Sequence, residues 1–173
     1  MASKSRKKAG SPPAGRPRGG PEAEDRCEWL LLDNQLCFAL YTASRLTVQA
    51  YQPLLEPLGL TYPQYVTLLV LWENDGITVS ELGERLSLDS GTLSPLLKKL
   101  EQKDLITRVR KPEDERSVVL RLTAQGRELK QRAKSVPERI SKVACLQGGQ
   151  FARMKKDLED LSGNLRGLMG RKE

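Results

Sequence analysis

Residues 78–122, TVSELGERLSLDSGTLSPLLKKLEQKDLITRVRKPEDERSVVLRL, contain the pattern that decides the fold. Thr78 and Glu81 have the spacing of an N-terminal capping box, which predicts the start of a short helix. Asp89 or Ser90 begins a second helix after a tight connection, because both residue types favour the N-cap position. Two short helices joined in this way are typical of a helix-turn-helix.

Two strand-like runs follow the second helix. Residues 105–110, LITRVR, and residues 117–122, SVVLRL, have the length and composition of short strands. Between them, residues 111–116, KPEDER, are expected to form a charged turn. A hairpin directly after a helix-turn-helix predicts a wing, so the fold class expected here is a winged helix-turn-helix, mainly α with a small β-hairpin.

The segments before this region have helical spacing. An amphipathic helix is expected from Cys27 to about Ala50, followed by one or two turns that Pro53 and Pro57 interrupt. Pro95 is expected in the first turn of the second short helix, where proline is tolerated.

Helix signals continue on both sides of the hairpin. Thr61 and Gln64 repeat the capping-box spacing ahead of an apolar helix. After the hairpin, Thr123 is expected to cap one helical segment with an irregularity at Pro137, and a last helix covers residues 149–169. The leucine stripe of this last helix is too long for a small core to cover, so pairing with a second subunit is expected.

We divide the chain into four parts at these signals. They are a disordered basic tail (1–24), N-terminal helices (25–60), the winged helix-turn-helix (61–123) and C-terminal helices (124–173).

Composition excludes several kinds of protein. The chain has no histidine, so Ser-His-Asp and Cys-His catalysis and histidine-bearing zinc sites are ruled out. Its three cysteines form no CxxC pair, which disfavours a secreted disulfide framework and a zinc knuckle. No apolar run approaches the length of a membrane-spanning helix. A cytoplasmic binding protein without metal or cofactor, and not an enzyme, is the resulting expectation.

The positive charge is unevenly distributed. Residues 1–20 carry six basic and no acidic residues, which leaves 23 basic and 22 acidic residues in the rest of the chain. Within that nearly neutral rest, residues 90–121 hold eight basic and five acidic residues. This local excess favours binding of double-stranded DNA by the helix-turn-helix and wing. The alternatives are lysines that only keep a helix face soluble, and a tail that is a solvated leader or a phosphate-binding arm.

The candidate DNA-binding residues follow from this placement. They lie on the second short helix and the hairpin: Ser90, Gly91, Thr92, Ser94, Lys98, Arg108, Lys111 and Arg116.

Four separated motifs, LDNQLCFALY, LTYPQYVTLLVLWE, LDSGTLSPLLKKLE and DERSVVLRLT, resemble the organic hydroperoxide resistance regulators, a branch of the MarR repressors. The resemblance covers residues 29 to about 140. It implies a homodimer joined through the first and last helices that binds a pseudo-palindromic operator. It also implies release from that operator when an organic hydroperoxide oxidises one cysteine.

The resemblance also assigns roles to residues. Cys37 matches the redox-sensing cysteine. Tyr51 and Tyr62 match tyrosines of the opposite subunit that hydrogen-bond to it, and Tyr41 matches a further nearby tyrosine. Arg116 matches a wing arginine directed at the minor groove. Without the motif, Cys37 would be read as a small buried apolar residue.

The role of Cys145 stays open. Relatives with two cysteines carry a resolving thiol shortly after a Val-Pro element like residues 136–137, but Lys142 occupies that position here. Three outcomes remain: an intersubunit disulfide between Cys37 and Cys145, capture of oxidised Cys37 by a low-molecular-weight thiol, or an inert Cys145.

Two other functions compete with an oxidant-sensing repressor. The first is a MarR-type repressor released by a small phenolic or other anionic ligand. The second is a thiol peroxidase, which the missing CxxC pair and the basic winged-helix region disfavour.

Overall fold

The computed structural model describes residues 28–111, 114–144 and 148–169. The helices are α1 (Leu36–Leu55), α2 (Tyr62–Glu73), α3 (Val79–Leu86), α4 (Ser90–Gln102), α5 (Ala124–Ala133), α6 (Val136–Ala144) and α7 (Gln150–Met169), with short 3-10 turns η1 (Glu28–Leu30), η2 (Leu32–Asn34) and η3 (Glu56–Leu58). The strands are β1 (Ile106–Lys111) and β2 (Asp114–Leu122). The chain divides into two units within α1, after Thr42.

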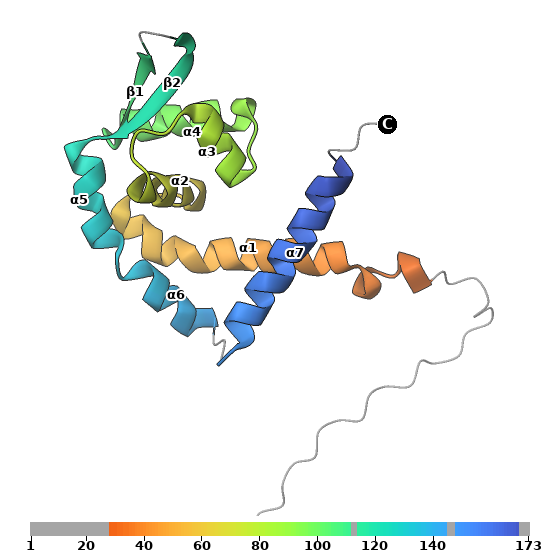
Figure 1. The fold of residues 1–173 in the computed structure, drawn as a ribbon. Coiled ribbons are helices and arrows are strands. Elements are labelled where there is room, and N and C mark those ends of the chain that lie inside the picture. Colours follow the sequence, from red (N-terminus) through yellow and green to blue (C-terminus); the bar gives the residue numbers. More distant parts are fainter. Residues whose placement is uncertain (1–27, 112–113, 145–147, 170–173) are drawn as a thin grey trace, which may run out of the picture. The chain divides into compact units, whose positions relative to one another are not determined.

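The second unit contains the expected winged helix-turn-helix. In Figure 1, α3 and α4 lie together on one side of α2, and the β1–β2 hairpin extends beyond them. The strands are antiparallel, with Ile106 opposite Leu122 and Arg110 opposite Val118. Because β2 begins at Asp114, the predicted six-residue turn was too long, and its centre lies outside the described residues.

The capping signals of the sequence are confirmed. Thr61 and Gln64 form a capping box at the start of α2, and Thr78 and Glu81 form one at the start of α3. Thr123 caps α5 by accepting a hydrogen bond from the Gly126 N–H. These side chains satisfy N–H groups that have no partner within the helix, and this fixes where each helix begins.

The predictions for the prolines were less accurate. Pro53 lies inside α1, which continues to Leu55, and Pro95 lies inside α4 rather than in its first turn. Both prolines are exposed, so water can reach the carbonyl that each leaves without a helical donor. Pro137 is the second residue of α6, so the predicted single segment is two helices, α5 and α6.

The N-terminal helix is also shorter than expected. Cys27 lies outside the described residues, and the chain passes through η1 and η2 before α1 begins at Leu36. The last helix, expected over residues 149–169, is confirmed as α7.

A leucine core holds the second unit together. Side chains from α2, α3, α4 and β2 are almost completely buried in it, among them Leu68, Leu71, Leu82, Leu100 and Leu120. Burying each such side chain stabilises the fold by about 1.5–3 kcal/mol. No helix among the described residues is long and apolar enough to cross a membrane.

A close contact joins α5 to the base of the wing. A Cβ atom on Gly126 would lie 2.1 Å from the carbonyl oxygen of Leu105. That oxygen accepts a hydrogen bond from the Thr123 N–H, so it is held in place. Trp72 Nε1 also donates to the Gly126 carbonyl oxygen, at 2.9 Å.

Substituting Gly126→Ala should therefore destabilise the protein. The new methyl group must displace backbone, so the free energy of unfolding should fall by about 2–3 kcal/mol. Urea denaturation followed by circular dichroism measures the change. Gly163→Ala in α7 is the matched control, because nothing lies within 4 Å of its Cβ position. Equal midpoints for the two variants would contradict the contact.

Candidate nucleic-acid interface and thiol site

Asp89 fixes the start of α4, the second helix of the helix-turn-helix. Its Oδ1 accepts a hydrogen bond from the Thr92 N–H and its Oδ2 accepts one from the Thr92 hydroxyl, both at 2.9 Å. These hydrogen bonds, the backbone one first, lower the pKa of the Asp89 carboxyl group. The carboxylate therefore stays charged at neutral pH and interacts favourably with the positive end of the helix dipole.

The two faces of α4 differ in burial. Leu93, Leu97 and Leu100 are at most 1% exposed and anchor the helix in the core. The predicted DNA-binding residues of this helix are all exposed: Ser90, Gly91, Thr92, Ser94 and Lys98. The structure thus leaves all five candidates accessible from solvent.

Two of these exposed hydroxyl groups already donate hydrogen bonds within the protein. Thr92 donates to Asp89, and Ser94 Oγ donates to the Ser90 carbonyl oxygen at 2.7 Å. A hydroxyl whose hydrogen is engaged still offers its oxygen lone pairs. In this arrangement both side chains present acceptors to a ligand, which suits amino groups of bases better than phosphate oxygens.

Arg108 of β1 is paired within the protein. Its Nε donates to Glu101 Oε2 at 2.7 Å, and its Nη2 forms an ion pair with the same carboxylate. The hydrogen bond to Glu101 raises the pKa of the Arg108 guanidinium. This contact joins the wing to α4, and Glu101 is a partner that the sequence analysis did not identify.

The other wing candidates are only partly described. Lys111 ends β1 and Arg116 lies in β2, but their side chains fall outside the described part of the chain. The wing has one feature that the sequence pattern missed, a short pairing with the segment before α3. Thr78 bridges Val119, and the Leu120 N–H donates to the Ile77 carbonyl oxygen at 2.8 Å.

The candidate sensing thiol lies at the beginning of α1. Cys37 is the second residue of this helix and is exposed as a free thiol. Tyr41, one helical turn further, is also exposed. The N-terminal end of a helix carries partial positive charge, which favours a nearby anion. Cys145 lies outside the described residues.

The tyrosines Tyr51 and Tyr62 meet in an aromatic cluster of the second unit. Their ring centroids are 4.9 Å apart, and the ring centroid of Tyr65 lies 5.9 Å from that of Tyr51. Burial, and next the neighbouring Tyr62, raise the pKa of Tyr51. Tyr51 therefore keeps its proton at neutral pH and can serve as a hydrogen-bond donor. Tyr65 and Trp72 extend the cluster, and sequence reasoning had assigned them no role.

Comparison with known proteins identifies the family. A family model described as transcriptional regulator SarA/Rot matches residues 49–133. The organic hydroperoxide resistance transcriptional regulator of Bacillus subtilis is 47% identical over 138 residues, which are 80% of this chain and 94% of that protein. The chain belongs to the organic hydroperoxide resistance regulators of the MarR family.

Solved structures of a related regulator agree with this assignment. Reduced AbfR bound to DNA is 39% identical, with a TM-score of 0.69 over 83% of this chain and 98% of AbfR. A disulfide form of AbfR is also 39% identical, with a TM-score of 0.59 over 82% of this chain and 95% of AbfR. AbfR has also been solved from Staphylococcus epidermidis. The winged-helix fold and the role as a transcriptional regulator are thus shown.

Lys98 is exposed, whereas Arg108 is paired with Glu101, so we expect the two side chains to contribute differently to DNA binding. Lys98→Met removes an exposed positive charge and should reduce the slope of log affinity against log salt by about 0.9. Arg108→Met should leave that slope unchanged, because Glu101 already neutralises the guanidinium. Fluorescence anisotropy over a salt series, with a duplex selected from a random-sequence library, measures both slopes. A larger slope change for Arg108→Met would overturn the ranking.

Proposed function

We propose that this regulator is a homodimeric repressor that binds a pseudo-palindromic operator and is released when an organic hydroperoxide oxidises Cys37. The observation that carries the proposal is the exposed free thiol of Cys37 at the start of α1, in a chain 47% identical to an organic hydroperoxide resistance regulator. AbfR supports it, because that protein has been solved reduced on DNA and in a disulfide form.

The exposed surface of α4 supports the DNA-binding half of the proposal. Ser94 and Lys98 are exposed on α4, one helical turn apart. Buried leucines of the same helix hold α4 in the core. In a winged helix, this helix enters the major groove and the hairpin reaches the neighbouring minor groove. Two copies of α4 about one turn of DNA apart would read the two halves of a palindrome.

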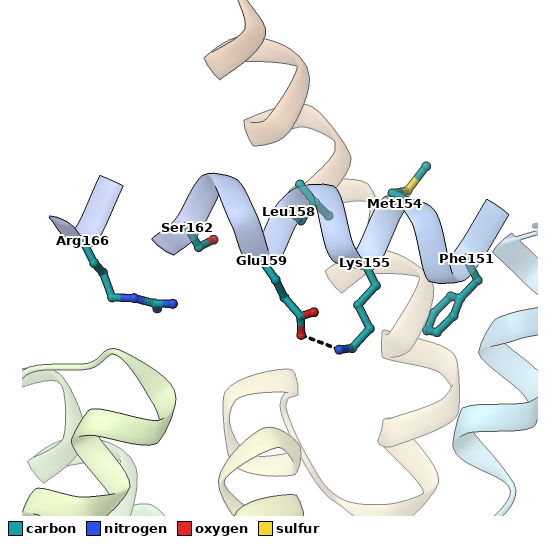
Figure 2. Close-up of a pocket in the computed structure, with 7 residues that line it drawn as sticks. All are labelled: Phe151, Met154, Lys155, Leu158, Glu159, Ser162 and Arg166. Carbon is teal, nitrogen blue, oxygen red and sulfur yellow. Dashed lines mark hydrogen bonds and ion pairs between the residues drawn. The ribbon is translucent and has the colours of Figure 1, made fainter. Parts of the chain in front are cut away.

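The apolar side of α7 supports the dimer. No residue of α7 is buried, and Phe151, Met154, Leu158 and Leu165 are each between 43% and 60% exposed. Figure 2 shows Met154 and Leu158 turned away from the ion pair of Lys155 and Glu159. A helix with such a face needs a partner, and a second copy joined through the N- and C-terminal helices supplies one. We accordingly assign residues 25–60 and 124–173 to dimerisation and residues 61–123 to DNA binding.

The chemistry at Cys37 is a two-electron oxidation. The thiolate attacks the terminal oxygen of the hydroperoxide, an S–O bond forms, and the O–O bond breaks. The leaving alkoxide takes a proton and departs as the alcohol, which leaves Cys37 as a sulfenic acid. A thiol, either Cys145 or a low-molecular-weight thiol, can then condense with it to a disulfide and release water.

A hollow beside Tyr62 fits an apolar oxidant better than an anionic ligand. Its volume is about 440 Å³, and its lining includes Val48, Leu55, Leu60 and Pro63. No basic side chain lines it, and Glu56 is one of its lining residues. A phenolate or carboxylate ligand would find no counter-charge in this hollow.

Replacing Cys37→Ser tests the sensing role. Both proteins should bind the selected duplex with the same affinity when reduced, because serine is nearly isosteric with cysteine. After treatment with cumene hydroperoxide, only the unmodified protein should lose affinity, by at least tenfold, which corresponds to about 1.4 kcal/mol. Equal release of both proteins would reject Cys37 as the sensor. A phenolic acid that releases both would instead establish the alternative.

Tyrosine hydroxyl groups from the partner subunit should speed the oxidation of Cys37. Hydrogen bonds to a charged group contribute about 1.5–3 kcal/mol, so Tyr51→Phe or Tyr62→Phe should slow sulfenic acid formation by roughly tenfold or more. Stopped-flow measurement with a sulfenic-acid probe gives the rate. Tyr65→Phe is the control from the same aromatic cluster and should keep the original rate. Identical rates for all three variants would remove the tyrosines from the mechanism.

A further inference from the structure

A cationic clamp holds the turn between α1 and α2. Lys103 Nζ, at the C-terminal end of α4, donates to the Gly59 carbonyl oxygen and to Gln64 Oε1, the latter at 3.1 Å. From α5, Arg132 Nη2 donates to the Pro57 carbonyl oxygen at 2.8 Å. Two helices thus bind carbonyl groups of one short turn, residues 56–59, through positive side chains.

This turn lies between the two tyrosines of the proposed sensor. Tyr51 precedes it in α1, and Tyr62 follows it as the first residue of α2. Their rings are in contact, so the two ends of the turn are joined by this aromatic pair. Any movement of Tyr62 relative to Tyr51 must therefore change the turn that Lys103 holds.

We propose that Lys103 is the positioning residue that couples the α1–α2 turn to the DNA-reading helix α4. The inference rests on the proposed function, in which α4 reads the operator. Lys103 follows directly after the last residue of α4, and its partner Gln64 is 2% exposed in the first turn of α2. A displacement of that turn is thus passed to the end of α4 through a hydrogen bond to a buried, fixed group.

The clamp is not what keeps the second unit folded. Gln64 Oε1 also accepts from the Thr61 N–H at 3.1 Å, so it keeps a partner if Lys103 is removed. The Gly59 carbonyl belongs to an exposed residue, and water can replace the ammonium group there. The leucines that bury α4 do not depend on Lys103. Loss of Lys103 should therefore weaken the coupling between the α1–α2 turn and α4 and leave the protein folded.

A double-mutant cycle on DNA binding tests the coupling. Gly59 has φ +67° and nothing within 4 Å of its Cβ position, so Gly59→Ala strains the turn without a steric clash. We expect Gly59→Ala to weaken binding of the selected duplex by reduced protein about fivefold when Lys103 is present. In the Lys103→Met background, the same change should alter the affinity less than about twofold.

Two matched variants separate coupling from other effects. Lys130→Met removes a similar bond, from Lys130 Nζ to the Trp72 carbonyl oxygen at 2.7 Å, and should leave the effect of Gly59→Ala unchanged. Lys103→Arg keeps the positive donor and should restore the coupling. If Lys103 were instead a phosphate ligand, Lys103→Met would reduce the salt slope by about 0.9 and the cycle would be additive.

The double-mutant cycle tests the role of Lys103 in reduced protein, so its result does not depend on oxidation of Cys37. Additive effects of Gly59→Ala and Lys103→Met, or no effect of Gly59→Ala on DNA affinity, would overturn it. Should the Lys103→Met protein fail to fold by circular dichroism, the cycle is run with Lys103→Gln, and the same criteria apply. Treatment with cumene hydroperoxide is a separate arm. If the unmodified protein stays on DNA after this treatment, the oxidant-sensing proposal fails. The double-mutant cycle, measured with reduced protein, still tests the coupling role of Lys103.

Discussion

The burial of three leucines on one side of α4 is the constraint on which the rest of the structure depends. Leu93, Leu97 and Leu100 are spaced three or four residues apart, so they lie on one face of the helix and enter the core together. Ser90, Thr92, Ser94 and Lys98 are exposed around the rest of the helix. The same pattern that stabilises the domain therefore decides which side chains are available to a ligand.

Sequence reasoning predicted the features that depend on local chemistry. The capping boxes at Thr61 and Thr78 were identifiable because their partners lie three residues away. Prolines were harder to place, since whether Pro53 or Pro95 ends a helix depends on whether the carbonyl one turn earlier faces water. That property belongs to the folded protein, so the sequence alone could not reveal it.

The missed parts of the candidate site are contacts between distant residues. Arg108 was predicted to meet DNA because it is basic and lies in the wing, but its partner Glu101 became apparent only when α4 and β1 were folded together. The clamp of Lys103 on Gly59 and Gln64 joins residues about 40 positions apart, and no spacing rule predicts it. Likewise, the redox assignment of Cys37 came from a resemblance, because one exposed cysteine has no diagnostic spacing of its own.

The helix α2 connects the aromatic cluster to both α4 and the wing. At its N-terminal end, Gln64 binds Lys103 of α4. Just beyond its C-terminal end, Asp75 accepts from the Leu122 N–H at the base of the wing at 2.8 Å and pairs with Arg127 of α5. Since both ends are tied to elements that carry candidate DNA contacts, a rotation of α2 would move α4 and the wing together. A change at Tyr62, the first residue of α2, would thus alter the position of the whole reading surface and would not merely disorder one part of it.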